Sequence, residues 1–141
     1  MPKKSARIWA IAGLGLAATI AGARAETISL VAYLTGRAAV PANDGSAFGQ
    51  AQFTYDSDTR QLDYLVTYDG LPAAQVEIHG PADASRNGPV LIPLPTPDSP
   101  VSGAVILSRA QGAELLEGNL YVDVHSAGYA RGEIRGQIEQ R

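Results

Sequence analysis

Residues 49–68 read GQAQFTYDSDTRQLDYLVTY, and this stretch decides the fold class. Before residue 56, small or apolar side chains alternate with Gln and Thr, and after residue 60, Leu, Tyr and Val alternate with mostly polar residues. A period of two places successive side chains on opposite faces of a β-strand. Between the two runs, Asp56, Ser57 and Asp58 can accept hydrogen bonds from the turn backbone. The stretch therefore predicts an antiparallel hairpin with one apolar face.

The same alternation recurs along the chain and is interrupted by turn residues. Residues 82–100 hold five prolines, which exclude a helix and a central strand, so we expect a long loop there with a short extended piece at 90–92. These patterns predict an all-β fold, an antiparallel β-sandwich of immunoglobulin-like or superoxide-dismutase-like Greek-key type, with one short helical turn near residues 109–117. The other predicted strands are 28–34, 74–79, 101–107, 120–125 and 133–139.

The N-terminal 25 residues have the pattern of an export signal. Lys3, Lys4 and Arg7 precede an apolar stretch, and small residues flank Arg24 at the end of it. This is the layout of a secretory signal peptide, and we predict cleavage after Ala25. The alternative is an uncleaved membrane anchor. Cleavage would leave one domain, residues 26–141, in the periplasm or secreted, with no membrane span.

Charge and cysteine content narrow the classes of partner. Removal of the leader takes four of the 11 basic residues, which leaves seven arginines against 14 Asp and Glu and a formal charge of −7. Nucleic acid binding requires clustered cations, so we expect no nucleic acid partner. The chain has no Cys, which excludes disulfides, thiol catalysis and thiolate metal sites. We expect an unidentified protein or small ligand outside the cytoplasm as partner.

Several blocks of the sequence resemble the CHRD (chordin) domain, in a free-standing member of the bacterial type. The most specific are LEGNLYVDVHS at 116–126 and GEIRGQI at 132–138, and EIHGPA at 77–82 and NGPV at 87–90 support them. Glu77 stands where family members often carry a His. The resemblance implies a β-sandwich domain of the kind found in exported or extracellular proteins. It indicates the fold and the compartment more firmly than it indicates an activity.

Two histidines and their neighbours are the candidates for chemistry. By strand parity, each His shares the polar face of its predicted strand with a carboxylate two residues earlier. The last predicted strand carries a carboxylate and an arginine on one face. If the three strands are neighbours, these side chains converge into one ligand site or structural network: Glu77, His79, Asp123, His125, Glu133 and Arg135.

Two interpretations of this group stay open. Two imidazoles with carboxylates suit zinc or copper, which predicts a metal or small-ligand site at His79 and His125. The other interpretation is a buried polar network that ties strands and loop together. The sequence favours the network, because neither His lies in a close-spaced ligand motif.

The predicted function follows from these observations. We expect an exported, non-enzymatic binding or structural module of CHRD type that needs no cofactor, and as the alternative a periplasmic zinc- or copper-binding protein. Ser126 next to His125 is no catalytic pair, because adjacent strand residues point to opposite faces. Tyr129, which follows Gly128, is expected in a loop as an exposed contact residue.

Overall fold

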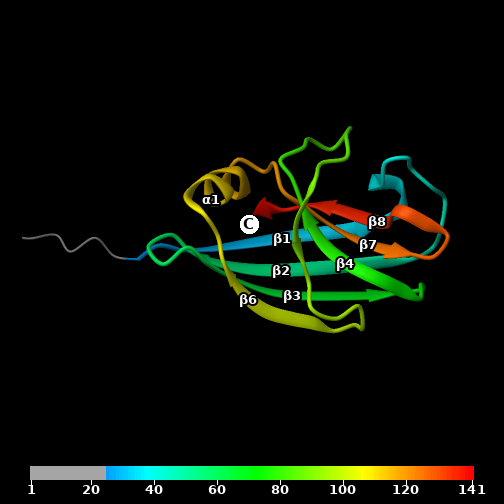
Figure 1. The fold of residues 1–141 in the computed structure, drawn as a ribbon, viewed down its shortest axis with the longest axis horizontal. Coiled ribbons are helices and arrows are strands. Elements are labelled where there is room, and N and C mark those ends of the chain that lie inside the picture. The colour runs from blue at the N-terminus through cyan, green and yellow to red at the C-terminus, as the bar shows by residue number, and fades with distance from the viewer. Residues whose placement is uncertain (1–24) are drawn as a thin grey trace, which may run out of the picture.

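A computed structural model describes residues 25–141, so the predicted signal peptide lies outside the described residues except for Ala25. Figure 1 shows strands that curl around a common interior, with one short helix at the end of the molecule opposite the β7–β8 turn. In the described part of the chain, no helix has the length and apolar character needed to cross a membrane.

The described residues form nine strands, one 3-10 helix and one α-helix. All strand pairs are antiparallel, and the order across the sheet is β5-β4-β7-β8-β1-β2-β3-β6, with β9 added beside β1. The elements are β1 (Thr27–Thr35), η1 (Gly36–Ala38), β2 (Phe48–Asp56), β3 (Gln61–Asp69), β4 (Ala73–His79), β5 (Val90–Pro93), β6 (Val101–Ile106), α1 (Arg109–Leu116), β7 (Tyr121–Ser126), β8 (Tyr129–Gln137) and β9 (Glu139–Gln140).

The sheet consists of two halves that join where β8 and β9 lie beside β1. Strand β1 pairs with β8 through Thr35 and Arg135, and with β9 through Leu30 opposite Gln140 and Val31 opposite Glu139, so β5-β4-β7-β8 and β1-β2-β3-β6 are the two halves of one curled sheet. The prediction of an all-β antiparallel fold with a short helix is confirmed. The two predicted layers prove to be parts of one continuous sheet rather than separate sheets.

Both halves contribute one apolar face to the core. Each large aliphatic side chain in it contributes roughly 1.5–3 kcal/mol by leaving water. Because the alternation has a period of two, the opposite faces of the same strands stay available for polar side chains. The fully buried aliphatic residues include Leu30, Leu34, Leu62, Val66, Val76, Ile78, Val122, Val124 and Ile134.

The predicted hairpin and helix are present. In the β2–β3 turn, Asp56 Oδ1 accepts hydrogen bonds from the backbone N–H groups of Asp58 and Thr59, each at 2.9 Å. Helix α1 begins after Ser108, whose hydroxyl accepts from the Gln111 N–H while the Gln111 side chain accepts from the Ser108 N–H. Such a capping box satisfies two backbone donors at the helix start.

Strand β8 begins earlier than the sequence predicted. Residues 127–128 form a tight turn, and Tyr129 is the first residue of β8, paired with Ser126. The placement of Tyr129 in a loop was therefore wrong, because the β7–β8 turn has only two residues, whereas the alternation pattern left residues 126–132 between the predicted strands. Its side chain is 40% exposed.

The segment between β4 and β5 covers the outer face of β7. As a result, all six residues of β7 are buried, although only one of its faces contacts the apolar core. The covering segment is anchored by backbone hydrogen bonds at both ends, from the Gly80 N–H to Pro89 O and from the Ala82 N–H to Asn119 O. A polar site thereby lies on the outer face of β4 and β7, beside the covering loop.

Candidate metal centre

The register of β4 against β7 brings two carboxylates together. Glu77 lies directly opposite Asp123, and their side chains share the outer face of the sheet. Like charges directly opposite each other on antiparallel strands repel. Both residues are also buried, with 7% of Glu77 and 1% of Asp123 exposed. This pair requires positive charge between the two carboxylates.

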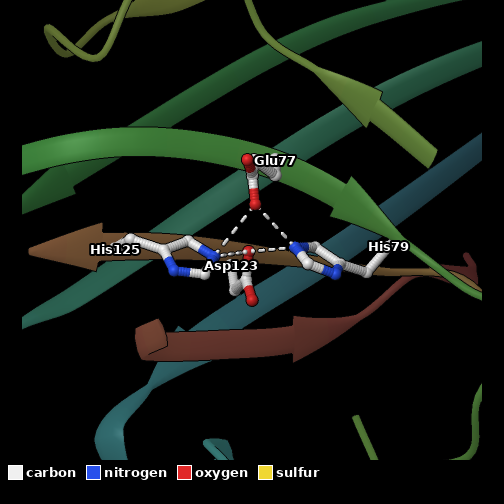
Figure 2. A group of neighbouring side chains, drawn as sticks. All are labelled: Glu77, His79, Asp123 and His125. Atoms are coloured by element: carbon white, nitrogen blue, oxygen red, sulfur yellow. Dashed lines mark hydrogen bonds and ion pairs between the residues drawn. The ribbon is translucent and has the colours of Figure 1, made fainter. Parts of the chain in front are cut away.

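Two histidines supply the neighbouring positions. His79 follows Glu77 by two residues on β4, and His125 follows Asp123 by two residues on β7. Since the strands are antiparallel, one imidazole lies on each side of the carboxylate pair (Figure 2). The imidazole rings are partly stacked, with centroids 5.7 Å apart and 23° between their planes.

Four side-chain atoms from these residues form a closed ring, which we call the His–carboxylate ring. Going round it, His79 Nε2 lies 2.9 Å from Glu77 Oε2, and that oxygen lies 3.1 Å from His125 Nε2. His125 Nε2 lies 2.9 Å from Asp123 Oδ1, which closes the ring at 3.1 Å from His79 Nε2. Nitrogen and oxygen atoms therefore alternate, and each nitrogen contacts both carboxylates (Figure 2).

The other nitrogen of each imidazole contacts a backbone carbonyl. His79 Nδ1 lies 3.0 Å from Gly88 O, and His125 Nδ1 lies 2.9 Å from Ala130 O. A carbonyl oxygen only accepts hydrogen bonds, so both Nδ1 atoms carry a proton and donate. Each Nε2 is then either a second N–H on an imidazolium or a lone pair directed into the ring.

Without a metal, protons satisfy the ring. Burial lowers the pKa of His79, but hydrogen bonds to Asp123, to the Gly88 carbonyl and to Glu77 outweigh burial and raise it to about 9. For His125, the hydrogen bond to Asp123 is the largest effect and raises the pKa despite burial. Burial raises the pKa of Asp123, yet the two imidazoles together hold it below its usual value. The carboxylates therefore favour the protonated form of both imidazoles.

A divalent cation fits the same charges and the same geometry. If each Nε2 is a lone pair, the ring presents two neutral imidazole nitrogens and two anionic oxygens, all four within 4.8 Å of one another. Neighbouring ligand atoms 2.9–3.1 Å apart suit an ion with bonds of about 2 Å, the length of zinc–nitrogen and zinc–oxygen bonds. The backbone carbonyls on Nδ1 are the outer partners that orient metal-bound imidazoles.

A stack of flat side chains continues outward from the ring. Tyr121, two residues before Asp123 on β7, lies against His79 with ring centroids 5.1 Å apart and 13° between the planes. The guanidinium carbon of Arg135 lies 3.6 Å from the centre of the Tyr121 ring. The Tyr121 hydroxyl accepts from the Gly88 N–H at 2.9 Å, so it also holds in place the residue whose carbonyl orients His79.

Arg135 ties the covering loop to the sheet. Its side chain is 2% exposed, and it donates to Arg86 O and Asp83 O, each at 2.8 Å. It also donates to Gln137 Oε1 at 2.7 Å and to Asn87 Oδ1 at 3.3 Å. Arg135 thus touches no ring atom but holds the loop that carries Gly88 over His79.

A glycine on β8 allows the close approach of Asp123. Gly132 has a φ of +100°, and a Cβ at this position would lie 3.0 Å from Asp123 Oδ2. A side chain is therefore disfavoured both by the backbone conformation and by the carboxylate. The ring itself lines an open cleft of about 520 Å³.

The six candidates from the sequence fall into three groups. Glu77, His79, Asp123 and His125 form the ring, and Arg135 lies in the layer beyond Tyr121. Glu133 lies apart and accepts a 2.5 Å hydrogen bond from the Ser126 hydroxyl, so the expected convergence of all six residues on one point was wrong for Glu133. This separation arises because the β7–β8 register shifts between Val124 and Ser126.

The sequence analysis missed three contributors to this site. Tyr121 could have been found, since it shares the face of Asp123 and His125 by parity. The carbonyls of Gly88 and Ala130 carry no side-chain signal, and only the three-dimensional path of the loop and the β7–β8 turn brings them to the imidazoles.

Comparison with known proteins identifies the family. No curated protein and no solved structure proved similar to the chain. The family model of the CHRD domain matches residues 30–138, which include every strand that builds the site. The match spans well over half of the chain, and the protein therefore belongs to the CHRD domain family.

Proposed function

We propose that this chain is an exported, non-enzymatic binding module of CHRD type that holds one divalent zinc or copper ion in the His–carboxylate ring. One observation carries the proposal. Each Nε2 faces two carboxylate oxygens at 2.9–3.1 Å, while each Nδ1 is already engaged by a backbone carbonyl. Lone pairs of four ligands directed at one point suit a metal ion.

The ligand set narrows the choice of metal. Two imidazole nitrogens and two carboxylate oxygens suit both Zn²⁺ and Cu²⁺. The general order of divalent affinities also places Cu²⁺ above Zn²⁺. We expect both ions to bind, and copper to displace zinc.

Other features support an exported module without an activity of its own. The charged, apolar and small-residue pattern of residues 1–25 is that of a secretory signal. In the described residues, the Ser126 hydroxyl donates to Glu133 and does not contact His125, so no serine–histidine pair forms there. CHRD domains serve in general as binding modules, which agrees with a site that holds a ligand.

Metal content tests the proposal. The full-length chain is expressed with its leader, purified with chelator, incubated separately with Zn²⁺ and Cu²⁺, desalted and analysed by mass spectrometry. We expect about one ion per chain, and a loss of at least about ten-fold in affinity for Glu77→Gln, because a charged ligand is removed.

Glu133→Gln is the matched control for this test. It removes a nearby carboxylate that is bonded to Ser126 and lies outside the ring, so metal uptake should stay as in the wild type. Substoichiometric metal in the folded wild type, or equal losses in Glu77→Gln and Glu133→Gln, would refute the metal site. The ring would then be an imidazolium–carboxylate network that ties β4 to β7.

A further inference from the structure

The cleft over the His–carboxylate ring gives a bound metal one accessible side. All four ring residues line this cleft of about 520 Å³, whereas the other side of the ring faces β4 and β7, which carry them. A cavity of this size accommodates a small molecule. A metal at the centre of the ring therefore keeps a coordination position directed into the cleft.

The charge of the cleft favours an anion. One divalent ion and the two ring carboxylates sum to zero, so the ring neither attracts nor repels an anion by its net charge. Among the other residues that line the cleft, Arg131 is the one charged side chain. In the part of the chain that the structure describes, its exposed guanidinium has no ion-pair or hydrogen-bond partner.

The other polar side chains that line the cleft differ in whether they are free to bind a ligand. Asn87 is engaged, since its amide donates to Val40 O at 2.6 Å and accepts from Arg135. Gln75 is exposed at the edge of the cleft, and Val90 and Ala130 supply apolar surface. The cleft thus combines a metal position, a planar cationic donor and a small apolar wall.

We propose that this cleft binds a small carboxylate, with one carboxylate oxygen on the metal and the carboxylate group paired with Arg131. The inference rests on the proposed metal site. A guanidinium can pair bidentately with a carboxylate, and the apolar side chains of Val90 and Ala130 in the same cleft favour an organic acid over an inorganic anion. The alkyl part of such a ligand would contact Val90 and Ala130. No bond in the ligand is made or broken, because the step is exchange of water for carboxylate on the metal.

Acetate titration of the copper-loaded, full-length protein tests this proposal. The visible absorption and electron paramagnetic resonance spectra of Cu²⁺ report a change in its ligands. We expect acetate to shift both spectra in a saturable way, while acetamide, which has the same shape without the charge, leaves them unchanged. Arg131→Gln should weaken acetate binding by about five-fold or more at low salt, because the charge-assisted pair is lost.

Arg109→Gln is the matched control, since Arg109 is the first residue of α1 and lines a different hollow, to which no residue of the His–carboxylate ring contributes. It should bind acetate as the wild type does, and both variants should retain stoichiometric copper. If copper fails to bind, the proposed function fails. If copper binds but acetate leaves the spectra unchanged, or binds Arg131→Gln and the wild type equally, the carboxylate site is overturned.

The same titration distinguishes two sources of the carboxylate. A tripeptide with a free C-terminus represents a protein terminus, and acetate represents a free small acid. If the tripeptide binds more tightly than acetate and loses this binding when its C-terminus is amidated, the result supports a site that recognises the C-terminal carboxylate of a protein chain. Tighter binding of acetate supports a site for free acids, and binding of neither overturns the proposal.

Discussion

Two imidazoles share two buried carboxylates in this site, so its charge balance depends on whether protons or a metal ion lie between them. The ring is neutral either with two protons on the Nε2 atoms or with one divalent ion in their place. Removal of both would leave two carboxylates facing each other in a buried position, which is costly. At the residue scale, the stability of the folded chain should therefore depend on pH when the metal is absent. It should depend on pH much less when the metal is present.

The stability of the metal-free protein should fall as the pH rises. The folded-state pKa of His79, about 9, exceeds its unfolded value of 6.5. The stabilisation is therefore complete below pH 6.5 and disappears as the pH passes through 9. It amounts to roughly 3 kcal/mol for a shift of this size. Urea unfolding at pH 6, 8 and 10 in the presence of chelator measures it.

The variant His79→Gln provides the control for this pH dependence. It cannot gain a proton in this range, so its free energy of unfolding should vary less with pH than that of the wild type. A wild-type free energy of unfolding that stays constant or increases between pH 6 and 10 would contradict the assignment of protons to the ring.

At the scale of elements, strand parity could be read from the sequence but strand pairing could not. The alternation in 74–79 and 120–125 already placed each His on the same face as its carboxylate. The pairing of β4 with β7 joins segments more than 40 residues apart, and their register is set by the core contacts of Val76, Ile78, Val122 and Val124. Such a register depends on tertiary packing, so the distance between the imidazoles was not predictable.

The covering loop was predicted only as a loop. Proline density excluded a helix and a central strand in residues 82–100, and the short extended piece expected at 90–92 is confirmed as the edge strand β5, but nothing in the sequence indicated that residues 80–89 cross the outer face of β7. Arg135 was predicted to tie neighbouring strands, and it bonds instead mainly to loop carbonyls and to Gln137 on its own strand. Backbone carbonyls have no sequence signature, which is why these partners were missed.

Arg135→Lys should destabilise the protein by about 1–3 kcal/mol, because a lysine cannot reproduce the forked donors to Asp83 O and Arg86 O. Hydrogen exchange should become faster in residues 82–89, and metal affinity should fall because the Gly88 carbonyl no longer orients His79. Arg86→Lys is the control, since the Arg86 side chain is 74% exposed and its pair with Asp83 contributes little. An unchanged free energy of unfolding for Arg135→Lys would contradict this role.

On the scale of the whole molecule, the fold separates stability from binding. The apolar faces of both half-sheets supply the core, and the outer face of β4 and β7 is left for the polar site. The described part of the chain carries many more carboxylates than arginines. A net negative surface attracts cations over a distance but cannot hold one, so selective binding requires the ring.

X-ray absorption at the metal edge of the zinc- or copper-loaded protein identifies the ligands of the bound ion. An ion held in the His–carboxylate ring should have a first shell of nitrogen and oxygen at about 2.0–2.2 Å, with the outer-shell scattering of two imidazoles. Spectra of the Asp123→Asn variant should lose this signature, and those of Glu133→Gln should keep it. A bound ion whose spectrum contains no imidazole, or only one, would show that the ring does not hold the metal.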